Sequence, residues 1–277
     1  MDPVGEGGMK AWAGAWALIV MLLAAAPAPA AETDADRAER WKALREAVFR
    51  DRAVSPGDGV IELEAPTRAQ DAALVPITVT LPGTERVTAV YILVDANPSP
   101  LAGIFRFGPA ADPRSLKTRV RVDQYTLMHA VAETEDGRLF VAERFVKAAG
   151  GCSAPSLKDP QLAMSRMGQM RLRLDGDAGP REGQPATAHL LVSHPNNNGM
   201  QMDQVSRHFI PARYIQDIRV SYGDEPVFAF EADISLSEDP AITFGFVPRG
   251  PGPLRVEVQD STRAVWRQSF DVAARGS

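Results

Sequence analysis

Hydrophobic and polar residues alternate along most of this chain, in short runs separated by turn-forming residues such as Pro82-Gly83 and Glu135-Asp136-Gly137. An apolar residue at every second position predicts a β-strand with one buried face. The predicted strands cover residues 61–64, 75–81, 87–94, 103–107, 117–122, 129–133 and 139–145, and then 170–174, 186–192, 209–222, 227–232, 241–247, 254–260 and 264–272. Short strands at this spacing predict β-sandwich domains.

One segment has helical rather than strand periodicity. Residues 33–49 begin with acidic residues, which the N-terminal end of a helix dipole favours. Their apolar residues recur at helical spacing and form one face, made of Trp41, Leu44, Val48 and Phe49. The turn-forming residues 55–59 follow, so we predict one helix before the first strand.

The strand pattern is interrupted between residues 148 and 155, where Gly150, Gly151 and Cys152 are followed by Pro155. We therefore predict an all-β protein with two immunoglobulin-like β-sandwich domains in tandem. The first domain, with the helix, covers residues 32–148, and the second covers residues 164–277. Residues 149–163 form the predicted linker.

The N-terminus has the pattern of an export signal. A positive charge at Lys10 precedes an uncharged apolar run over residues 11–26, and Ala28-Pro29-Ala30 supplies the small residues that signal peptidase requires. The run is too short for a membrane span, and no stop-transfer pattern follows it. We predict that residues 1–31 are a Sec-type signal peptide, starting at Met1 or Met9. Its cleavage would leave a periplasmic protein without a membrane segment.

Charge and cysteine content narrow the possible functions. The 277 residues carry a net charge of -5, which argues against a nucleic-acid partner. An exported chain with one cysteine has no intramolecular disulfide, so this cysteine is a free thiol, a mixed-disulfide site or an attachment point.

Cys152 is therefore the leading candidate for chemistry. Gly150 and Gly151 lack side chains and predict a flexible, thin backbone before the thiol. A thiolate can hold a sulfur group reversibly, as a persulfide or a thiosulfonate. The alternative is that Cys152 is an incidental small residue in a linker.

Several other polar residues have two interpretations. Arg114, Arg119 and Arg121 suit an anionic cargo, but such arginines more often line a solvated strand face. The run at residues 196–199 indicates a surface turn, with a partner contact as the alternative. Packing is the expected role of His129 and His189.

Soft ligands are also present, because His194, Met200, Met202 and His208 lie close together in the sequence. Copper favours such side chains, but no histidine follows Cys152 at blue-copper spacing. We therefore predict no metal site and no cofactor. The common sequence signatures of serine hydrolases, zinc proteases and nucleotide-binding enzymes are absent, which favours a non-enzyme.

Several motifs resemble a known family. Asn97-Pro98-Ser99-Pro100, the strand at residues 118–122 and the Gly-Gly-Cys resemble the sulfur carrier SoxY. The second half resembles SoxZ, through Ser193-His194-Pro195, residues 210–218 and residues 239–246. The order resembles fused SoxYZ-like carriers associated with quinoprotein dehydrogenases.

This resemblance implies a periplasmic carrier that holds a sulfur intermediate from thiosulfate oxidation on Cys152 and performs no catalysis itself. Its partners would be sulfur-oxidation or quinoprotein dehydrogenase proteins. His194, Pro195 and Pro211 would be interface residues, and the packed domains would form a monomer. Two departures stand out: Ser153-Ala154-Pro155 replaces the trailing glycines, and the Gly-Gly-Cys is tethered at both ends.

Two further readings remain open. In the first, the chain would be an accessory or docking protein for a periplasmic quinoprotein dehydrogenase, and Cys152 would carry no cargo. Alternatively, it is a thiol enzyme in which Cys152 is the nucleophile and His194 or His208 is the base.

Overall fold

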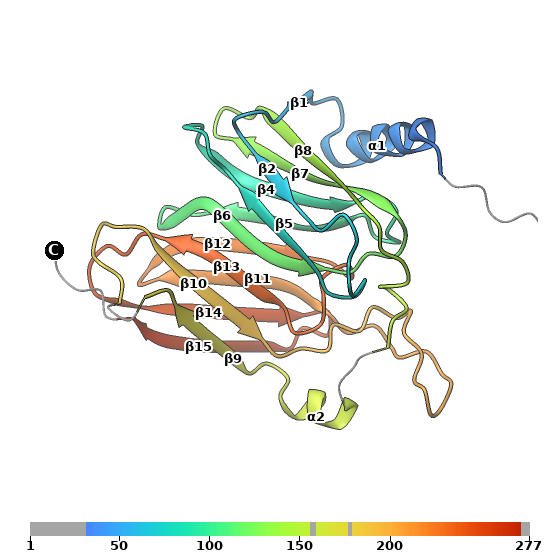
Figure 1. The fold of residues 1–277 in the computed structure, drawn as a ribbon. Coiled ribbons are helices and arrows are strands. Elements are labelled where there is room, and N and C mark those ends of the chain that lie inside the picture. The colour runs from blue at the N-terminus through green and yellow to red at the C-terminus, as the bar shows by residue number, and fades with distance from the viewer. Residues whose placement is uncertain (1–31, 156–158, 177–178, 273–277) are drawn as a thin grey trace, which may run out of the picture. The chain divides into compact units, whose positions relative to one another are not determined.

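Two packed β-sheets form the core of the computed structural model, which describes residues 32–155, 159–176 and 179–272 (Figure 1). The predicted signal peptide lies outside the described residues. The first half contains α1 (Asp34–Phe49), β1 (Val54–Pro56), β2 (Glu62–Glu64), β3 (Val75–Thr80), β4 (Val87–Val94), β5 (Leu101–Phe107), β6 (Ala111–Val120), β7 (Thr126–Thr134) and β8 (Leu139–Val146). The second half contains α2 (Pro160–Ser165), β9 (Met170–Leu174), β10 (Ala186–Val192), β11 (Ile215–Tyr222), β12 (Glu225–Ala232), β13 (Ala241–Phe246), β14 (Gly252–Asp260) and β15 (Val265–Val272).

Both sheets run through both halves of the chain. The nine-stranded sheet has the order β1-β8-β7-β4-β5-β12-β11-β14-β15, and the six-stranded sheet has the order β2-β3-β6-β13-β10-β9. The halves meet where β5 pairs antiparallel with β12 and where β6 pairs antiparallel with β13. The predicted sandwich architecture is confirmed, but the two sandwiches are joined edge to edge by backbone hydrogen bonds.

Aromatic side chains fill the core at this junction. Phe105 of β5 stacks on Phe230 of β12 with ring centroids 3.9 Å apart, and Phe228 lies edge-on to Phe244 of the opposite sheet at 5.0 Å. All four rings are buried. Since fully burying a phenylalanine side chain contributes about 1.5–3 kcal/mol, apolar contacts strongly favour keeping the halves together.

Helix α1 covers the outer face of the first half of the nine-stranded sheet. Trp41 stacks on the buried ring of His129 at 3.7 Å, and Phe49 packs edge-on against Tyr91. His129 also contacts the carboxylates of Asp95, at 2.9 Å, and Glu143, at 3.3 Å. The predicted helix and its apolar face are confirmed. Neither helix of the described residues is long and apolar enough to cross a membrane.

The structure corrects one local prediction and adds detail to two others. Residues 54–56 form β1 instead of belonging to a turn, because they pair with β8 from a distant part of the chain. The predicted linker contains most of α2, which begins because the Asp159 carboxylate accepts hydrogen bonds from the amides of Gln161 and Leu162. The strand predicted at residues 209–222 begins only at Ile215.

Candidate functional site

The Gly-Gly-Cys segment lies at the end of the first half, against the loop that follows β6. The amide of Gly150 donates to the carbonyl of Asp123 at 2.8 Å, and the amide of Gly151 donates to the carbonyl of Val122 at 3.0 Å. Gly151 and Cys152 are buried, whereas Gly150 and Ser153 on either side are exposed. The thiol therefore lies in a short buried stretch between two exposed residues.

Gly151 has a packing role in this position. A Cβ atom there would lie 2.1 Å from the carbonyl oxygen of Ala72 and 2.6 Å from that of Val122. Only glycine allows the backbone to approach these two carbonyls so closely. Backbone hydrogen bonds and close contacts hold the segment in this conformation, and the flexibility predicted for the backbone before the thiol stays a prediction. Gly150 differs, since it has a φ of +76° and no close neighbour.

The Cys152 side chain is 1% exposed, and the cysteine is free. Burial raises the pKa of its thiol to about 12, the negative charge of Asp123 acts in the same direction, and Arg121 acts against both. The thiol is therefore protonated at neutral pH in this position. Because the thiolate is the nucleophile, a buried, protonated Cys152 is a poor nucleophile.

Arg121 lies beside this segment and is also 1% exposed. Its guanidinium donates to the carbonyl of Gly151 at 3.2 Å and to the carbonyl of Asn196 in the second half at 3.5 Å. β6 ends at Val120, so the alternation of strand faces no longer applies at residue 121. The expectation of a solvated strand face is therefore wrong for Arg121.

A loop of the second half, residues 194–201, packs against the segment. The side-chain amide of Asn198 donates to the carbonyl of Cys152 at 2.7 Å. Asn196 donates to the carbonyl of Ser237 and accepts from the amide of Ile215. Both asparagines are buried, so the predicted surface turn is instead part of the contact between the halves. An asparagine-rich run does not indicate burial, because it has the same composition as a surface turn.

The predicted interface residues fall in different environments. His194 and Pro195 are buried in this loop, and Pro211 is exposed. The Nδ1 atom of His194 accepts from the amide of Asn196 at 3.0 Å, and its Nε2 atom lies 3.6 Å from Asp260. Burial lowers the pKa of His194. These contacts support a neutral, structural histidine, and no hydrogen bond in the described residues joins His194 or His208 to the Cys152 sulfur.

The other candidate ligands do not converge with Cys152. Arg114 is exposed and pairs with Asp112 at 2.8 Å, while Arg119 is half-buried and donates to the carbonyl of Asp239. Among the described residues, no group of three or more His, Cys, Asp and Glu side chains has an arrangement suited to a metal ion.

Asn97 begins the SoxY-like motif at residues 97–100, but the sequence analysis did not predict it as a site residue. Its side-chain amide donates to the carbonyl of Arg121 at 2.7 Å and to the hydroxyl of Ser235 at 2.9 Å. Its carbonyl oxygen accepts from the amide of Asp123 at 2.9 Å. Asn97 thus fixes the backbone on both sides of Val122 and ties it to the second half.

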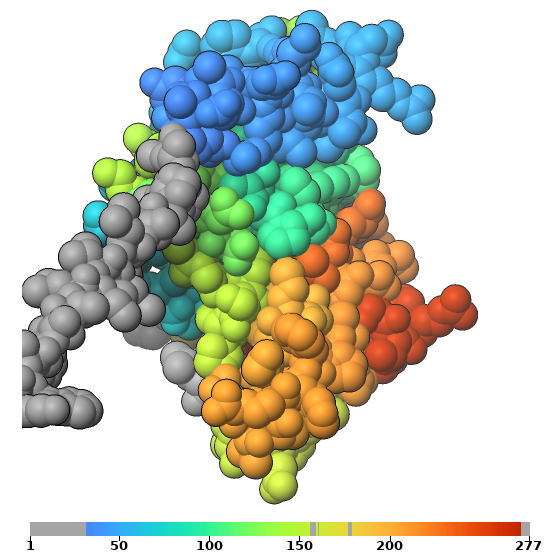
Figure 2. All heavy atoms as spheres, turned by 90° about the vertical axis from the view of Figure 1, so that its right-hand side faces the viewer, coloured from blue at the N-terminus to red at the C-terminus, as the bar shows by residue number. Residues whose placement is uncertain are grey.

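Several large apolar side chains of the described residues are exposed. Figure 2 shows one face of the molecule, on which the orange surface of residues near 200 adjoins the yellow-green surface of residues near 150. Val205 is 93% exposed and Phe209 is 64% exposed. Leu162 and Met164 of α2 and Tyr125 of the loop after β6 are also exposed.

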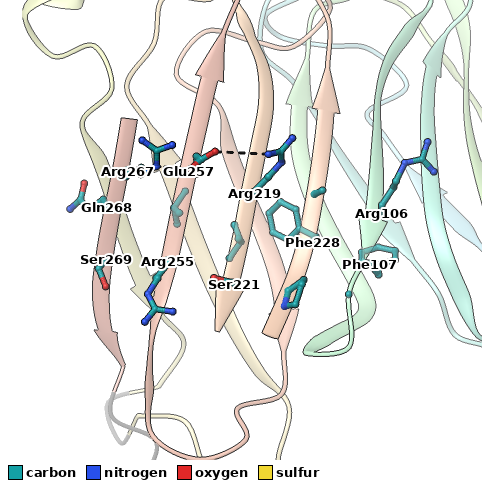
Figure 3. A pocket seen from close by; sticks show the side chains of 15 residues that line it. Arg106, Phe107, Arg219, Ser221, Phe228, Arg255, Glu257, Arg267, Gln268 and Ser269 are labelled. Carbon is teal, nitrogen blue, oxygen red and sulfur yellow. Dashed lines mark hydrogen bonds and ion pairs between the residues drawn. The ribbon is translucent and has the colours of Figure 1, made fainter. Parts of the chain in front are cut away.

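A separate groove of about 890 Å³ lies on the outer face of the nine-stranded sheet, across β5, β12, β11, β14 and β15 (Figure 3). Glu257 pairs with Arg267 at 2.6 Å and with Arg219 at 4.0 Å. Arg106 pairs with Glu231 at 3.0 Å, and Arg255 pairs with Asp224 at 3.2 Å. The arginines of the groove are thus neutralised by carboxylates, unlike Arg121.

Comparison with known families assigns both halves. Residues 45–152 match the family model of the sulfur oxidation protein SoxY, and residues 175–271 match that of the sulphur oxidation protein SoxZ. The chain belongs to the fused SoxY–SoxZ family. The SoxY match ends on Cys152, the single cysteine of the chain.

Solved structures add two similarities. The sulfur carrier protein SoxY from Chlorobium limicola f thiosulfatophilum is 27% identical, with 41% of this chain and 96% of that chain covered and a TM-score of 0.36. A presumptive membrane anchored protein from Corynebacterium diphtheriae is 14% identical, with 78% and 59% covered and a TM-score of 0.24. No curated protein sequence matches the chain.

Proposed function

We propose that this SoxY–SoxZ protein is a periplasmic carrier that holds a sulfur intermediate covalently on Cys152 and presents it to partner enzymes. The observation that carries the proposal is the SoxY match, which runs to the single cysteine of the chain. The predicted signal peptide at residues 1–31 supports the periplasmic location. The proposed partners are enzymes of sulfur oxidation or of a quinoprotein dehydrogenase system.

Loading requires a change in the position of Cys152. In the buried position the sulfur is shielded and its pKa is raised to about 12. The hydrogen bonds that opening would break are the backbone bonds of Gly150 and Gly151 and the side-chain bonds from Arg121 and Asn198. Gly150 and Ser153 are already exposed. We therefore propose that the carrier alternates between this closed state, which protects the sulfur, and an open state that exchanges it.

The SoxZ half serves the carrier by closing the site. Asn198 and the carbonyl of Asn196 contact the SoxY half directly at Cys152 and Arg121. Because both sheets continue from one half to the other, these contacts lie within one chain, and we propose that the protein acts as a monomer.

The proposal is tested by the intact mass of the mature protein purified from its native periplasm, with and without a reductant. A carrier has an added mass on Cys152, equal to one sulfur atom or to a sulfur oxyanion, that the reductant removes. The Cys152→Ser variant should lack this mass and lose sulfur-dependent growth. A bare thiol under all growth conditions would overturn the proposal.

A second function is an accessory role with no cargo, and the burial of Cys152 favours it, because an unused thiol is commonly buried. The two functions differ in the effect of Cys152→Ala. A carrier loses all activity with the thiol, whereas an accessory protein keeps partner binding and growth.

A further inference from the structure

Arg121 is the largest fully buried side chain in the described part of the chain. A guanidinium has five N–H donors, but Arg121 uses only two long hydrogen bonds, and its Nε atom has no partner. Buried charged groups are normally paired, because leaving water without a counter-charge is costly. Arg121 is therefore an under-satisfied buried cation.

The acidic side chains around Arg121 do not neutralise it at close range. Glu238 and Asp71 favour its charged form from a distance, and so does Cys152 in its ionised form. Within the described residues, Arg121 has no carboxylate partner at the 4.0 Å limit of an ion pair. Burial is the largest influence and lowers the pKa of Arg121. The Arg121 guanidinium thus has no close counter-charge and lies beside the residue that precedes the single cysteine, where it acts against the negative charge of Asp123 on the thiol.

We propose that Arg121 is an anion-binding residue whose guanidinium holds the negatively charged end of the sulfur group on Cys152. This inference rests on the proposed carrier function and adds the residue that holds the charged end of the cargo. Arg121 donates to the carbonyl of Gly151, so it lies next to the position from which such a group extends. A neutral sulfur group leaves the buried cation without a partner.

The neighbouring arginines are less buried than Arg121, although the Nε atom of Arg119 also has no hydrogen-bond partner among the described residues. Arg114 is exposed and already paired with Asp112. Arg119 lies two residues earlier and is half-buried, and its contact is with the carbonyl of Asp239 in the second half. Arg119 is therefore a suitable control position for the effect of removing an arginine from this region.

The test compares an anionic and a neutral group on Cys152 of the full mature chain. Tetrathionate supplies the anion: the thiolate attacks a central sulfur, a new S–S bond forms, and thiosulfate leaves with the electron pair of the broken S–S bond. Methyl methanethiosulfonate supplies the neutral group: the thiolate takes the methylthio group, and methanesulfinate leaves. Both reactions are run in denaturant, loading is confirmed by intact mass, and each product is refolded by dilution.

The melting temperature of each product is then measured. We expect the thiosulfonate form to melt at least about 4 °C above the methylthio form, which corresponds to one or two kcal/mol for a chain of this size. The difference should disappear in Arg121→Gln, survive in part in Arg121→Lys, and persist in Arg119→Gln.

Equal melting temperatures of the two wild-type forms would overturn the inference, and so would a difference that persists in Arg121→Gln. If Arg121→Gln does not fold, the melting-temperature difference between the two forms is compared among wild type, Arg121→Lys and Arg119→Gln. A difference that is smaller in Arg121→Lys than in the other two supports the inference, and an equal difference in all three overturns it. The result is independent of the native cargo. If the anion raises the melting temperature but the native protein has no sulfur adduct, the carrier function is wrong and the anion site stands. If the native protein has a sulfur adduct but the anion does not raise the melting temperature, the carrier function stands and the anion site is wrong.

Discussion

The side-chain amide of Asn198, in the SoxZ half, donates a 2.7 Å hydrogen bond to the backbone carbonyl of Cys152, the last residue of the SoxY match. Both residues are buried. This bond is a direct link between the second half and the cysteine, and in the proposed closed state it holds the segment in place.

Replacing Asn198 with alanine should therefore expose the thiol more often. The carbonyl of Cys152 would lose its buried partner, which costs about 1–3 kcal/mol and corresponds to roughly a 5- to 150-fold rise in the population of the open state. The rate of Cys152 alkylation, followed by intact mass, should rise by this factor. The matched control is Ser153→Ala, which removes an exposed 3.3 Å bond to the carbonyl of Gly150 and should change the rate little. An unchanged rate in Asn198→Ala would show that this bond does not hold the segment.

The two glycines before Cys152 should respond differently to substitution. Gly151→Ala places a methyl group 2.1 Å from the carbonyl oxygen of Ala72, so the segment has to leave its closed position. Gly150→Ala has space but a φ of +76°, and it should cost only about 1–2 kcal/mol. Alkylation should therefore become fast in Gly151→Ala, whereas in Gly150→Ala the rate should rise by no more than roughly 30-fold. Equal rates in both variants would argue for a segment that is open in the native state.

The buried thiol should make stability depend on alkaline pH. The pKa of Cys152 is raised to about 12 in the folded state, so the unfolded chain releases this proton at lower pH than the folded chain. The stability that the thiol contributes is thus present below pH 9 and is lost as the pH rises toward 12, by at most about 1.4 kcal/mol per pH unit. Denaturant unfolding of wild type and Cys152→Ala across this range isolates the effect. Parallel stability curves for the two proteins would contradict it.

Cutting the chain between the halves should not separate them. The pairs β5–β12 and β6–β13 and the aromatic contacts at the junction do not depend on the peptide connection after Pro155. A protease site introduced between Pro155 and Asp159 and then cleaved should give two fragments that elute together in gel filtration and part only in denaturant. Separate elution at micromolar concentration would mean that the shared sheets are too weak to hold the halves together.

Most of the strand positions could be predicted from the sequence, because many of the strands bury one face and alternate regularly, as β3 and β13 do. The family motifs were equally readable, since the SoxY and SoxZ resemblances are local in sequence. The pairing of β5 with β12 was not predictable in this way, because both strands have the same pattern whether they lie at an edge or in the middle of a sheet. β1 was missed for the same reason, since its partner β8 is far along the chain.

The single cysteine located the candidate site in the sequence, but the surroundings of Cys152 could not be predicted. Gly151 indicates freedom in a sequence, whereas here it allows close packing against the carbonyls of Ala72 and Val122. Arg121 resembles an exposed strand residue until the end of β6 is known. The asparagines at 196 and 198 satisfy backbone groups of other segments, and such long-range hydrogen bonds leave no local signal.

The continuity of the sheets also sets the order in which the chain can fold. Until β12 and β13 have been synthesised, β5 and β6 are bare edges of two unfinished sheets, which are prone to pair with other chains. Strands β5 and β6 of the first half therefore stay unpaired along one edge until most of the second half has emerged. Any helper that keeps the nascent chain from aggregating has to act until residue 246 is available.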